Sequence, residues 1–196
     1  YASSCSVYGS ADDKPRKENS ELNPLTAYAK SKVSTEKALE PLATDDFIVT
    51  CLRFATACGF SPRLRLDLVL NDFVASALSV GKIEILSDGT PWRPLIHVQD
   101  MARAIDWAVI RNNETANNFL VINTGSNSWN YQIKDLALAV KDQFKSIELS
   151  INEDAEPDKR SYQVDFSFFN QIAPNYVPQF DLIGAVKDLR IGLVSI

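Results

Sequence analysis

The sequence has few of the residues that build metal sites, disulfide frameworks or nucleic-acid surfaces. It contains a single histidine, His97, and no Cys-x-x-Cys pair, so a structural zinc site is not expected. Cys5, Cys51 and Cys58 are odd in number and lie among small or apolar residues, which favours reduced thiols over disulfides. Lys and Arg total 20 against 25 Asp and Glu, and the net charge of -5 disfavours an electrostatic nucleic-acid binder.

Long apolar runs are also missing. No stretch approaches the roughly 20 apolar residues that a membrane-spanning helix needs. The first residues lack the basic, apolar and small-residue order of a signal peptide. We therefore expect a soluble, cytoplasmic protein that does not bind membranes. With 196 residues, 45% of them hydrophobic, the chain is long enough for one domain and a fraction of another.

The order of the predicted elements indicates an α/β fold. Residues 1–9 have the pattern of a strand end that runs into a loop, and strands and helices then alternate along the chain. Asn23 is expected to cap the first helix, and Asp100 is expected to cap the third. The predicted strands are 47–54, 82–86, 94–98, 118–124 and 147–151, and the predicted helices are 25–40, 68–80, 100–111, 131–144 and 181–192.

The most informative spacing is that of Tyr28 and Lys32 on the first predicted helix. Four residues are about one helical turn, so the two side chains share a face. A lysine ammonium beside a phenol stabilises the phenolate, which suits a tyrosine to general acid–base catalysis. The same spacing also occurs where an aromatic core residue lies beside a solvated lysine. The strand end just upstream favours the catalytic interpretation, because Ser3, Ser4 and Ser6 offer hydroxyls that can bind a substrate oxygen.

These features occur in an order that resembles a known family. The strand end at 3–9, the Tyr28-x-x-x-Lys32 pair and the segments 52–54, 59–63, 87–100 and 158–162 resemble the extended short-chain dehydrogenase/reductase family, specifically its nucleotide-sugar epimerases and dehydratases. The resemblance implies that Ser4 is the catalytic serine and Tyr28 the acid/base. It implies that Lys32 holds the nicotinamide ribose of NAD or NADP and tunes the tyrosine. In such enzymes a sugar hydroxyl loses its proton to the tyrosine while a hydride passes to the cofactor, which gives a keto-sugar.

The resemblance also implies that the substrate is a nucleotide-diphosphate sugar. Arg93 matches an arginine that pairs with the substrate diphosphate, a role suited to a planar guanidinium. Asn71, Asp158 and Arg160 lie where related enzymes contact the substrate. For each of these residues the alternative is a surface ion pair or a helix-surface amide. His97 lies on an apolar strand and is expected to be structural.

One feature of the family is missing from the sequence. The chain has no Gly-x-x-Gly-x-x-Gly turn, which in the family receives the cofactor pyrophosphate at a helix N-terminus. It therefore resembles the C-terminal part of such an enzyme, with an incomplete Rossmann-like parallel sheet and a smaller α/β substrate-binding lobe. We expect a truncated chain that is inactive alone. The predicted division assigns 1–56 and about 94–125 to the sheet, and 57–93 and 126–196 to the lobe.

Smaller departures bear on the type of reaction. Cys5 and Ser6 occupy the positions at which sugar dehydratases carry Asp-Glu, which disfavours dehydration. Cys5 lies one residue from the cysteine acid/base of sugar 3,5-epimerases, and a shift of one residue reverses a side chain on a strand. Thr56 replaces an asparagine that is usual in the family. The sequence thus predicts an NAD(P)-dependent nucleotide-sugar epimerase that forms a homodimer. A keto-sugar reductase or dehydratase of the same family and a non-catalytic dimerising fragment are the alternatives.

Overall fold

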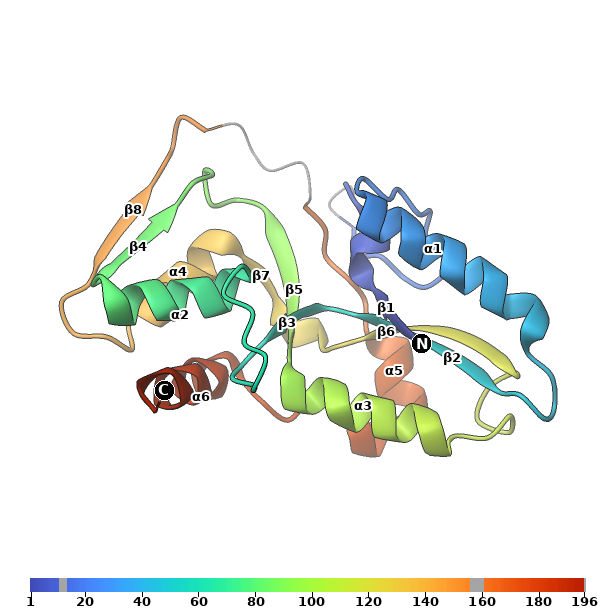
Figure 1. The fold of residues 1–196 in the computed structure, drawn as a ribbon. Helices are drawn as coiled ribbons and strands as arrows, with labels where there is room; N and C mark the ends of the chain where they lie inside the picture. Colours follow the sequence, from blue (N-terminus) through green and yellow to red (C-terminus); the bar gives the residue numbers. More distant parts are fainter. Residues whose placement is uncertain (11–13, 156–160, 196) are drawn as a thin grey trace.

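The computed structural model describes residues 1–10, 14–155 and 161–195, and it confirms a mixed α/β fold with parallel sheets (Figure 1). The helices are α1 (Ala27–Leu39), α2 (Val69–Ser79), α3 (Val98–Ile110), α4 (Ile133–Lys141), α5 (Ser167–Ile172) and α6 (Leu182–Val194). The strands are β1 (Ala2–Ser4), β2 (Val49–Phe54), β3 (Thr56–Cys58), β4 (Lys82–Ile85), β5 (Trp92–His97), β6 (Phe119–Thr124), β7 (Asn130–Gln132) and β8 (Glu148–Ile151). Within the described ranges, no helix is long and apolar enough to cross a bilayer.

A parallel sheet of β1, β2 and β6 forms one side of the molecule. The central strand β2 is buried along its whole length, because α1 covers one face of the sheet while α3 and α5 cover the other (Figure 1). Ser4 at the end of β1 pairs in register with Phe54 at the end of β2. The carboxyl ends of these strands therefore meet at one edge, which is where open α/β sheets bind their ligands.

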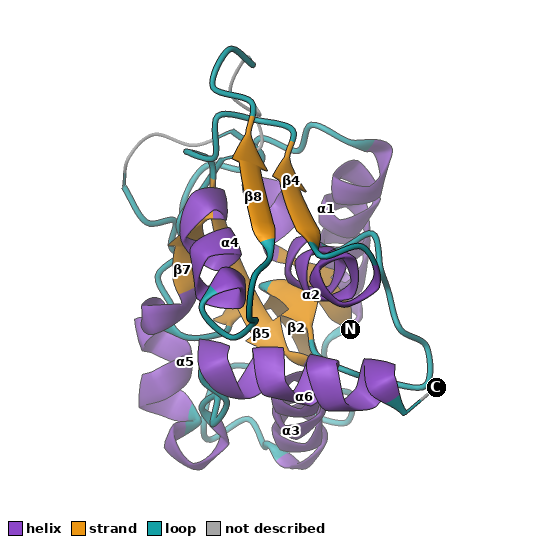
Figure 2. Cartoon of the chain, turned by 90° about the vertical axis from the view of Figure 1, so that its left-hand side faces the viewer, coloured by secondary structure: helices purple, strands orange, loops and turns teal. Residues whose placement is uncertain are grey.

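The other side of the molecule is built on the parallel pair β4 and β8. Figure 2 shows this pair with α2 and α4 beside it and α6 crossing below. A further sheet, in the order β3-β5-β7, connects the two sides. Among the described residues, two hydrophobic clusters are present, one around Tyr8, Leu52 and Phe166 and the other around Leu70 and Leu189. The predicted division assigns α5 to the lobe, but α5 packs in the first cluster with the β1-β2-β6 sheet. The division into sheet and lobe therefore stays a prediction.

The start of α1 differs from the sequence prediction. Thr26 is the N-cap, and its side chain accepts a hydrogen bond from Ala29 N at 3.1 Å. The prediction that Asn23 caps this helix was therefore wrong. The segment before Thr26 is not helical, and the threonine hydroxyl already satisfies a backbone donor of the first turn.

The prediction that Asp100 caps α3 was also wrong. His97 occupies the N-cap position, and its Nδ1 accepts a hydrogen bond from Gln99 N at 3.2 Å. Asp100 lies inside the first turn and is buried. Its carboxylate accepts hydrogen bonds from the backbone N–H groups of Gln179 and Phe180, at 3.0 and 3.1 Å. Asp100 was expected to cap its own helix, but its carboxylate instead binds the backbone of residues 179–180.

Candidate active site

Ser4 lies where β1 ends and the chain turns into a short 3-10 helix, Cys5–Tyr8. Its Oγ accepts a hydrogen bond from Ser6 N at 3.1 Å. A hydroxyl that accepts in this way still has its own hydrogen to donate. Ser4 also lines a cavity of about 480 Å³ at the carboxyl edge of the sheet. The strand end therefore presents a hydrogen-bond donor to this cavity.

Tyr28 and Lys32 line the same cavity from the first half of α1. Lys32 Nζ donates a hydrogen bond to the carbonyl oxygen of Ala2 at 2.8 Å, which connects the helix to β1. The ammonium lies 5.1 Å from the centroid of the Tyr28 ring and 5.0 Å from that of the Tyr1 ring. The structure thus brings the three predicted catalytic residues around one cavity, although their roles stay predictions.

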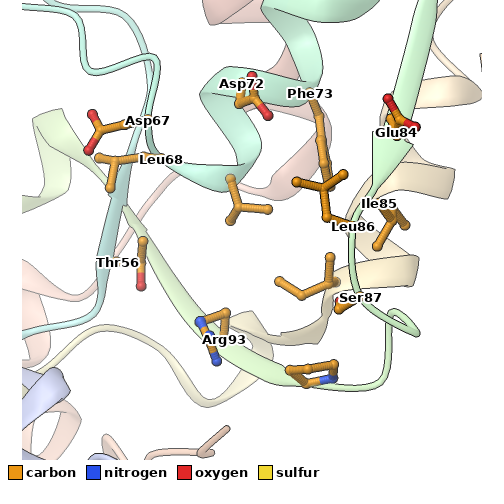
Figure 3. Close-up of a pocket in the computed structure, with 13 residues that line it drawn as sticks. Thr56, Asp67, Leu68, Asp72, Phe73, Glu84, Ile85, Leu86, Ser87 and Arg93 are labelled. Atoms are coloured by element: carbon orange, nitrogen blue, oxygen red, sulfur yellow. The ribbon is translucent and has the colours of Figure 1, made fainter. Parts of the chain in front are cut away.

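Arg93 lines two cavities next to the one that Ser4, Tyr28 and Lys32 line. A second cavity, of about 350 Å³, is lined by both Tyr28 and Arg93. A third, of about 560 Å³, is lined by Arg93 and by residues of β3, α2 and β4 (Figure 3). Thr56 and Asp67 lie on one side of this third cavity, and Ser87 lies on the opposite side (Figure 3). Thr56 and Leu68 line all three cavities, so the cavities are adjacent, and we call the three together the cleft.

Asn71, another predicted substrate contact, is not brought together with these residues. Asn71 is 2% exposed and lines none of the three cavities. Its Oδ1 accepts a hydrogen bond from Gly59 N at 3.1 Å, and its Nδ2 donates one to the carbonyl oxygen of Arg65 at 3.0 Å. The asparagine therefore fixes the backbone of the 59–68 loop. Asp158 and Arg160 lie outside the described residues.

Cys5 does not reach the cavity. Its side chain is buried, and its Sγ donates a hydrogen bond to the carbonyl oxygen of Arg53 at 3.0 Å. Burial raises the pKa of the Cys5 thiol well above its usual range. Cys5 is therefore not placed to act as an acid/base in this cavity. Cys51 and Cys58 are likewise buried free thiols, and burial raises the pKa of Cys51 to about 11.

A buried ion pair, which the sequence pattern did not predict, lies directly behind the site. Arg53 Nη2 donates to Glu36 Oε2 at 2.7 Å, and both residues are 4% exposed. Ser3 donates through Oγ to Glu36 Oε1 at 2.5 Å. Glu36 lies one helical turn beyond Lys32, and Ser3 immediately precedes Ser4. The pair thus connects α1, β1 and β2 at the point where the predicted catalytic residues meet.

The buried network continues toward β6. Arg53 Nη1 donates to the Tyr8 hydroxyl at 3.1 Å, and that hydroxyl donates to Asn123 Oδ1 at 2.7 Å. The backbone N–H of Asn123 in turn donates to Glu18 Oε1 at 3.0 Å. Burial raises the pKa of Glu18, and the bond from Asn123 partly opposes that rise. Glu18 therefore carries a charge that its surroundings disfavour.

His97 has the structural role that its position predicted. It is fully buried, and its ring stacks on Phe180 with a centroid distance of 3.6 Å. Because Nδ1 accepts the bond from Gln99 N, the ring hydrogen is placed on Nε2, which lies 3.0 Å from Asp188 Oδ2. Among the described residues, no group of three or more His, Cys, Asp or Glu side chains is arranged to hold a metal ion.

A parallel sheet with a serine at one strand end and a Tyr-x-x-x-Lys helix beside it defines an extended short-chain dehydrogenase/reductase fold. The chain belongs to the NAD dependent epimerase/dehydratase family, whose family model matches residues 1–125.

Curated relatives match a little over half of the chain. The uncharacterized UDP-glucose epimerase YtcB of Bacillus subtilis (strain 168) is 31% identical over 106 residues, which are 54% of this chain and 33% of that protein. Protein CapI of Staphylococcus aureus is 33% identical over 107 residues, which are 54% of this chain and 31% of CapI. The matched region therefore spans about a third of each relative.

Solved structures share the fold over the whole chain. The UDP-glucose-4-epimerase from Stenotrophomonas maltophila, with bound NAD and formylated UDP-arabinopyranose, superimposes with a TM-score of 0.80 at 21% identity. That match covers 99% of this chain and 62% of the other. At this identity the likeness shows the fold alone.

Proposed function

We propose that this chain is the catalytic and substrate-binding part of an NAD(P)-dependent nucleotide-sugar epimerase. The observation that supports it most is that Ser4, Tyr28 and Lys32 line one cavity, while Arg93 lines its continuation. The names of the relatives agree with this proposal, since one is called a UDP-glucose epimerase and a solved neighbour holds NAD with a UDP-sugar.

The residues at the sheet edge fit the nicotinamide ribose of NAD or NADP. Lys32 Nζ carries three N–H donors. Within the described residues it donates one hydrogen bond, to the carbonyl oxygen of Ala2. Tyr28 adds a phenol at the same wall, so Lys32 and Tyr28 would together hold the ribose hydroxyls. The bound cofactor would supply the hydride acceptor and donor. The pyrophosphate needs a binding element of its own, because the sequence lacks the glycine-rich turn.

The side chains of the cleft divide the remaining work. Tyr28 takes the proton from a sugar hydroxyl, and the nearby ammonium of Lys32 stabilises the phenolate. Ser4 donates a hydrogen bond to the same sugar oxygen, which orients it toward Tyr28. Arg93 binds the diphosphate and holds the sugar in place. Epimerisation through a transient keto-sugar follows if the sugar is reduced again from its other face.

A nucleotide-sugar panel tests this proposal. In a longer chain that includes a glycine-rich pyrophosphate-binding turn, and with NAD present, we expect a UDP-sugar to be converted to its epimer with no net change in reduced cofactor. In a parallel assay with reduced cofactor and a nucleotide keto-sugar, a net consumption of reduced cofactor would instead indicate the keto-sugar reductase. Tyr28→Phe should lower the rate by about 10²-fold or more, because it removes the proton acceptor and leaves the ring in place.

Binding gives a second readout that does not depend on turnover. Calorimetric titration of UDP-glucose should show saturable binding that Arg93→Gln weakens by about tenfold, the order expected when one charge-assisted contact is lost. No binding of any nucleotide sugar by the folded chain would overturn the proposal. We also expect a cytoplasmic homodimer, for which light scattering would give twice the 21.8 kDa chain mass.

A further inference from the structure

An exposed ion pair lies at the junction of the three cavities. Arg65 contacts Asp67 through two parallel bonds, Nε to Oδ1 and Nη2 to Oδ2, each 2.7 Å long. The two side chains are 60% and 64% exposed. Arg65 lines the cavity of the predicted catalytic residues and the second cavity, while Asp67 lines the second and third. The pair therefore faces the path that a substrate would occupy between Tyr28 and the far end of the cleft.

The backbone beneath this pair is fixed, whereas its side chains are not enclosed. Asn71 accepts from Gly59 N and donates to the carbonyl oxygen of Arg65, and Phe60 N donates to Asp188 Oδ2 at 2.7 Å. The loop thus holds the Cα of Arg65 at a defined place while the guanidinium remains exposed to the cleft. A long side chain on a fixed base can change partners without moving the loop.

The charges around the cleft favour such an exchange. Asp67 shares the third cavity with Asp72 and Glu84, so this end has three carboxylates (Figure 3). An incoming diphosphate meets repulsion there unless arginines offset it. The guanidinium fork binds a phosphate or a carboxylate in the same bidentate way. An ion pair this exposed contributes little net free energy, so a new anionic partner can replace the old one.

We propose that Arg65 is a second anion-binding residue of the cleft, which Asp67 holds in the free protein and releases to an anionic group of the nucleotide sugar. This inference rests on the proposed function. Arg65 and Arg93 line the second cavity together with Tyr28, so both guanidinium groups can reach one ligand there. The anionic group is the diphosphate or, on a uronic acid sugar, the carboxylate.

Calorimetry on the folded chain tests the exchange. We expect Arg65→Gln to weaken binding of UDP-glucose by about tenfold and Asp67→Asn to tighten it severalfold, because the competing carboxylate is gone. Arg63→Gln is the matched control, since Arg63 lies in the same exposed loop and lines none of the three cavities. It should stay within twofold of the parent chain.

UDP-glucuronic acid distinguishes the two sources of the anion. If Arg65→Gln weakens the binding of UDP-glucose and UDP-glucuronic acid equally, Arg65 binds the diphosphate. If it weakens the binding of UDP-glucuronic acid more, Arg65 binds the carboxylate. If Arg65→Gln binds like the parent chain while Arg93→Gln does not, the inference fails and the proposed function stands. If Asp67→Asn weakens binding as much as Arg65→Gln, Asp67 positions Arg65 rather than competing for it, which overturns the exchange. Absence of all binding would overturn both proposals.

Discussion

Two arginine–carboxylate pairs in this molecule have the same contact distance and opposite surroundings. The Glu36–Arg53 pair and the Arg65–Asp67 pair both close at 2.7 Å. The side chains of the first pair are 5% exposed, whereas those of the second are 60% and 64% exposed. Burial makes the first pair costly to disturb, because a charge left alone there has no solvent. Exposure leaves the second pair free to exchange. The environment, rather than the distance, separates the ion pair that fixes the structure from the one suited to binding a ligand.

The largest effect should come from breaking the buried pair. Glu36→Gln leaves the Arg53 guanidinium buried without its counter-charge, and we expect a loss of about 3–5 kcal/mol of unfolding free energy. Urea unfolding followed by circular dichroism measures it. The control is Glu40→Gln, one helical turn further on at an exposed position, which should leave the unfolding midpoint unchanged.

Removing both charges together sharpens this result. The double variant Glu36→Leu with Arg53→Met should recover part of the stability that Glu36→Gln loses, because no unpaired charge remains. Recovery will be incomplete, since Ser3 and the Tyr8 hydroxyl each lose a hydrogen-bond partner. A double variant less stable than Glu36→Gln would mean that the hydrogen bonds, and not the unpaired charge, carry the effect.

Substitution of Gly59 tests whether the start of the 59–68 loop is as rigid as the protein interior. Gly59 has φ = +102°, and a Cβ there would lie 2.2 Å from His97 Nε2. We expect Gly59→Ala to cost roughly 2–4 kcal/mol, from backbone strain together with overlap against a buried ring. Gly81→Ala is the matched control, because φ is +68° and nothing lies within 4 Å of the added carbon. It should cost only about 1–2 kcal/mol of left-handed strain. If both variants lost the same unfolding free energy, the His97 ring would be able to move away from the added methyl group at little cost.

Local spacing accounts for what the sequence could predict. Tyr28 and Lys32 share a face because of helical periodicity, and the β-branched run of β2 identified a strand whose end was placed correctly at Phe54. By contrast, β3 and β7 are each three residues long, which is too short for an alternating pattern to appear.

The parts that sequence reasoning missed depend on tertiary structure. Glu36 and Arg53 are 17 positions apart, and only the packing of α1 on the sheet turns them into a buried pair. Glu36 did continue the row of Tyr28 and Lys32 at four-residue spacing, so this signal was available. Asn71 was expected to contact substrate, but both of its amide atoms are used to hold the 59–68 loop. Its residue type alone could not reveal that.

A smaller effect concerns the charge of Glu18 at the margin of the buried network. Burial raises its pKa, so the folded chain binds a proton at Glu18 more readily than the unfolded chain does. The associated stability is present below the unfolded pKa of about 4.3 and is lost as the pH rises through the folded pKa. Glu18→Gln should therefore be slightly more stable than the parent chain at pH 7, by less than about 1 kcal/mol because the side chain is partly exposed.

The pH dependence provides the check on Glu18. The free energies of unfolding of the parent chain and of Glu18→Gln should be measured between pH 3.5 and 7, a range that includes the ordinary glutamate pKa of about 4.3. The two values should become equal toward the acid end of this range. A gap that widens on acidification would mean that the ionised form is favoured in the folded state.

The smallest effect on stability is expected at the exposed pair. Arg65→Gln and Asp67→Asn should leave the unfolding midpoint unchanged, because each charge that remains is solvated. Hydrogen bonding from Arg65 lowers the pKa of Asp67, so Arg65→Gln should raise that pKa toward the ordinary aspartate value, a change that carbon-detected NMR of the carboxyl group records. A clear loss of stability in either variant would place this pair in the structural framework with Glu36 and Arg53. An unchanged midpoint with a raised Asp67 pKa would show that the contact forms in solution without being needed for the fold, which is the property an exchangeable anion-binding arginine requires.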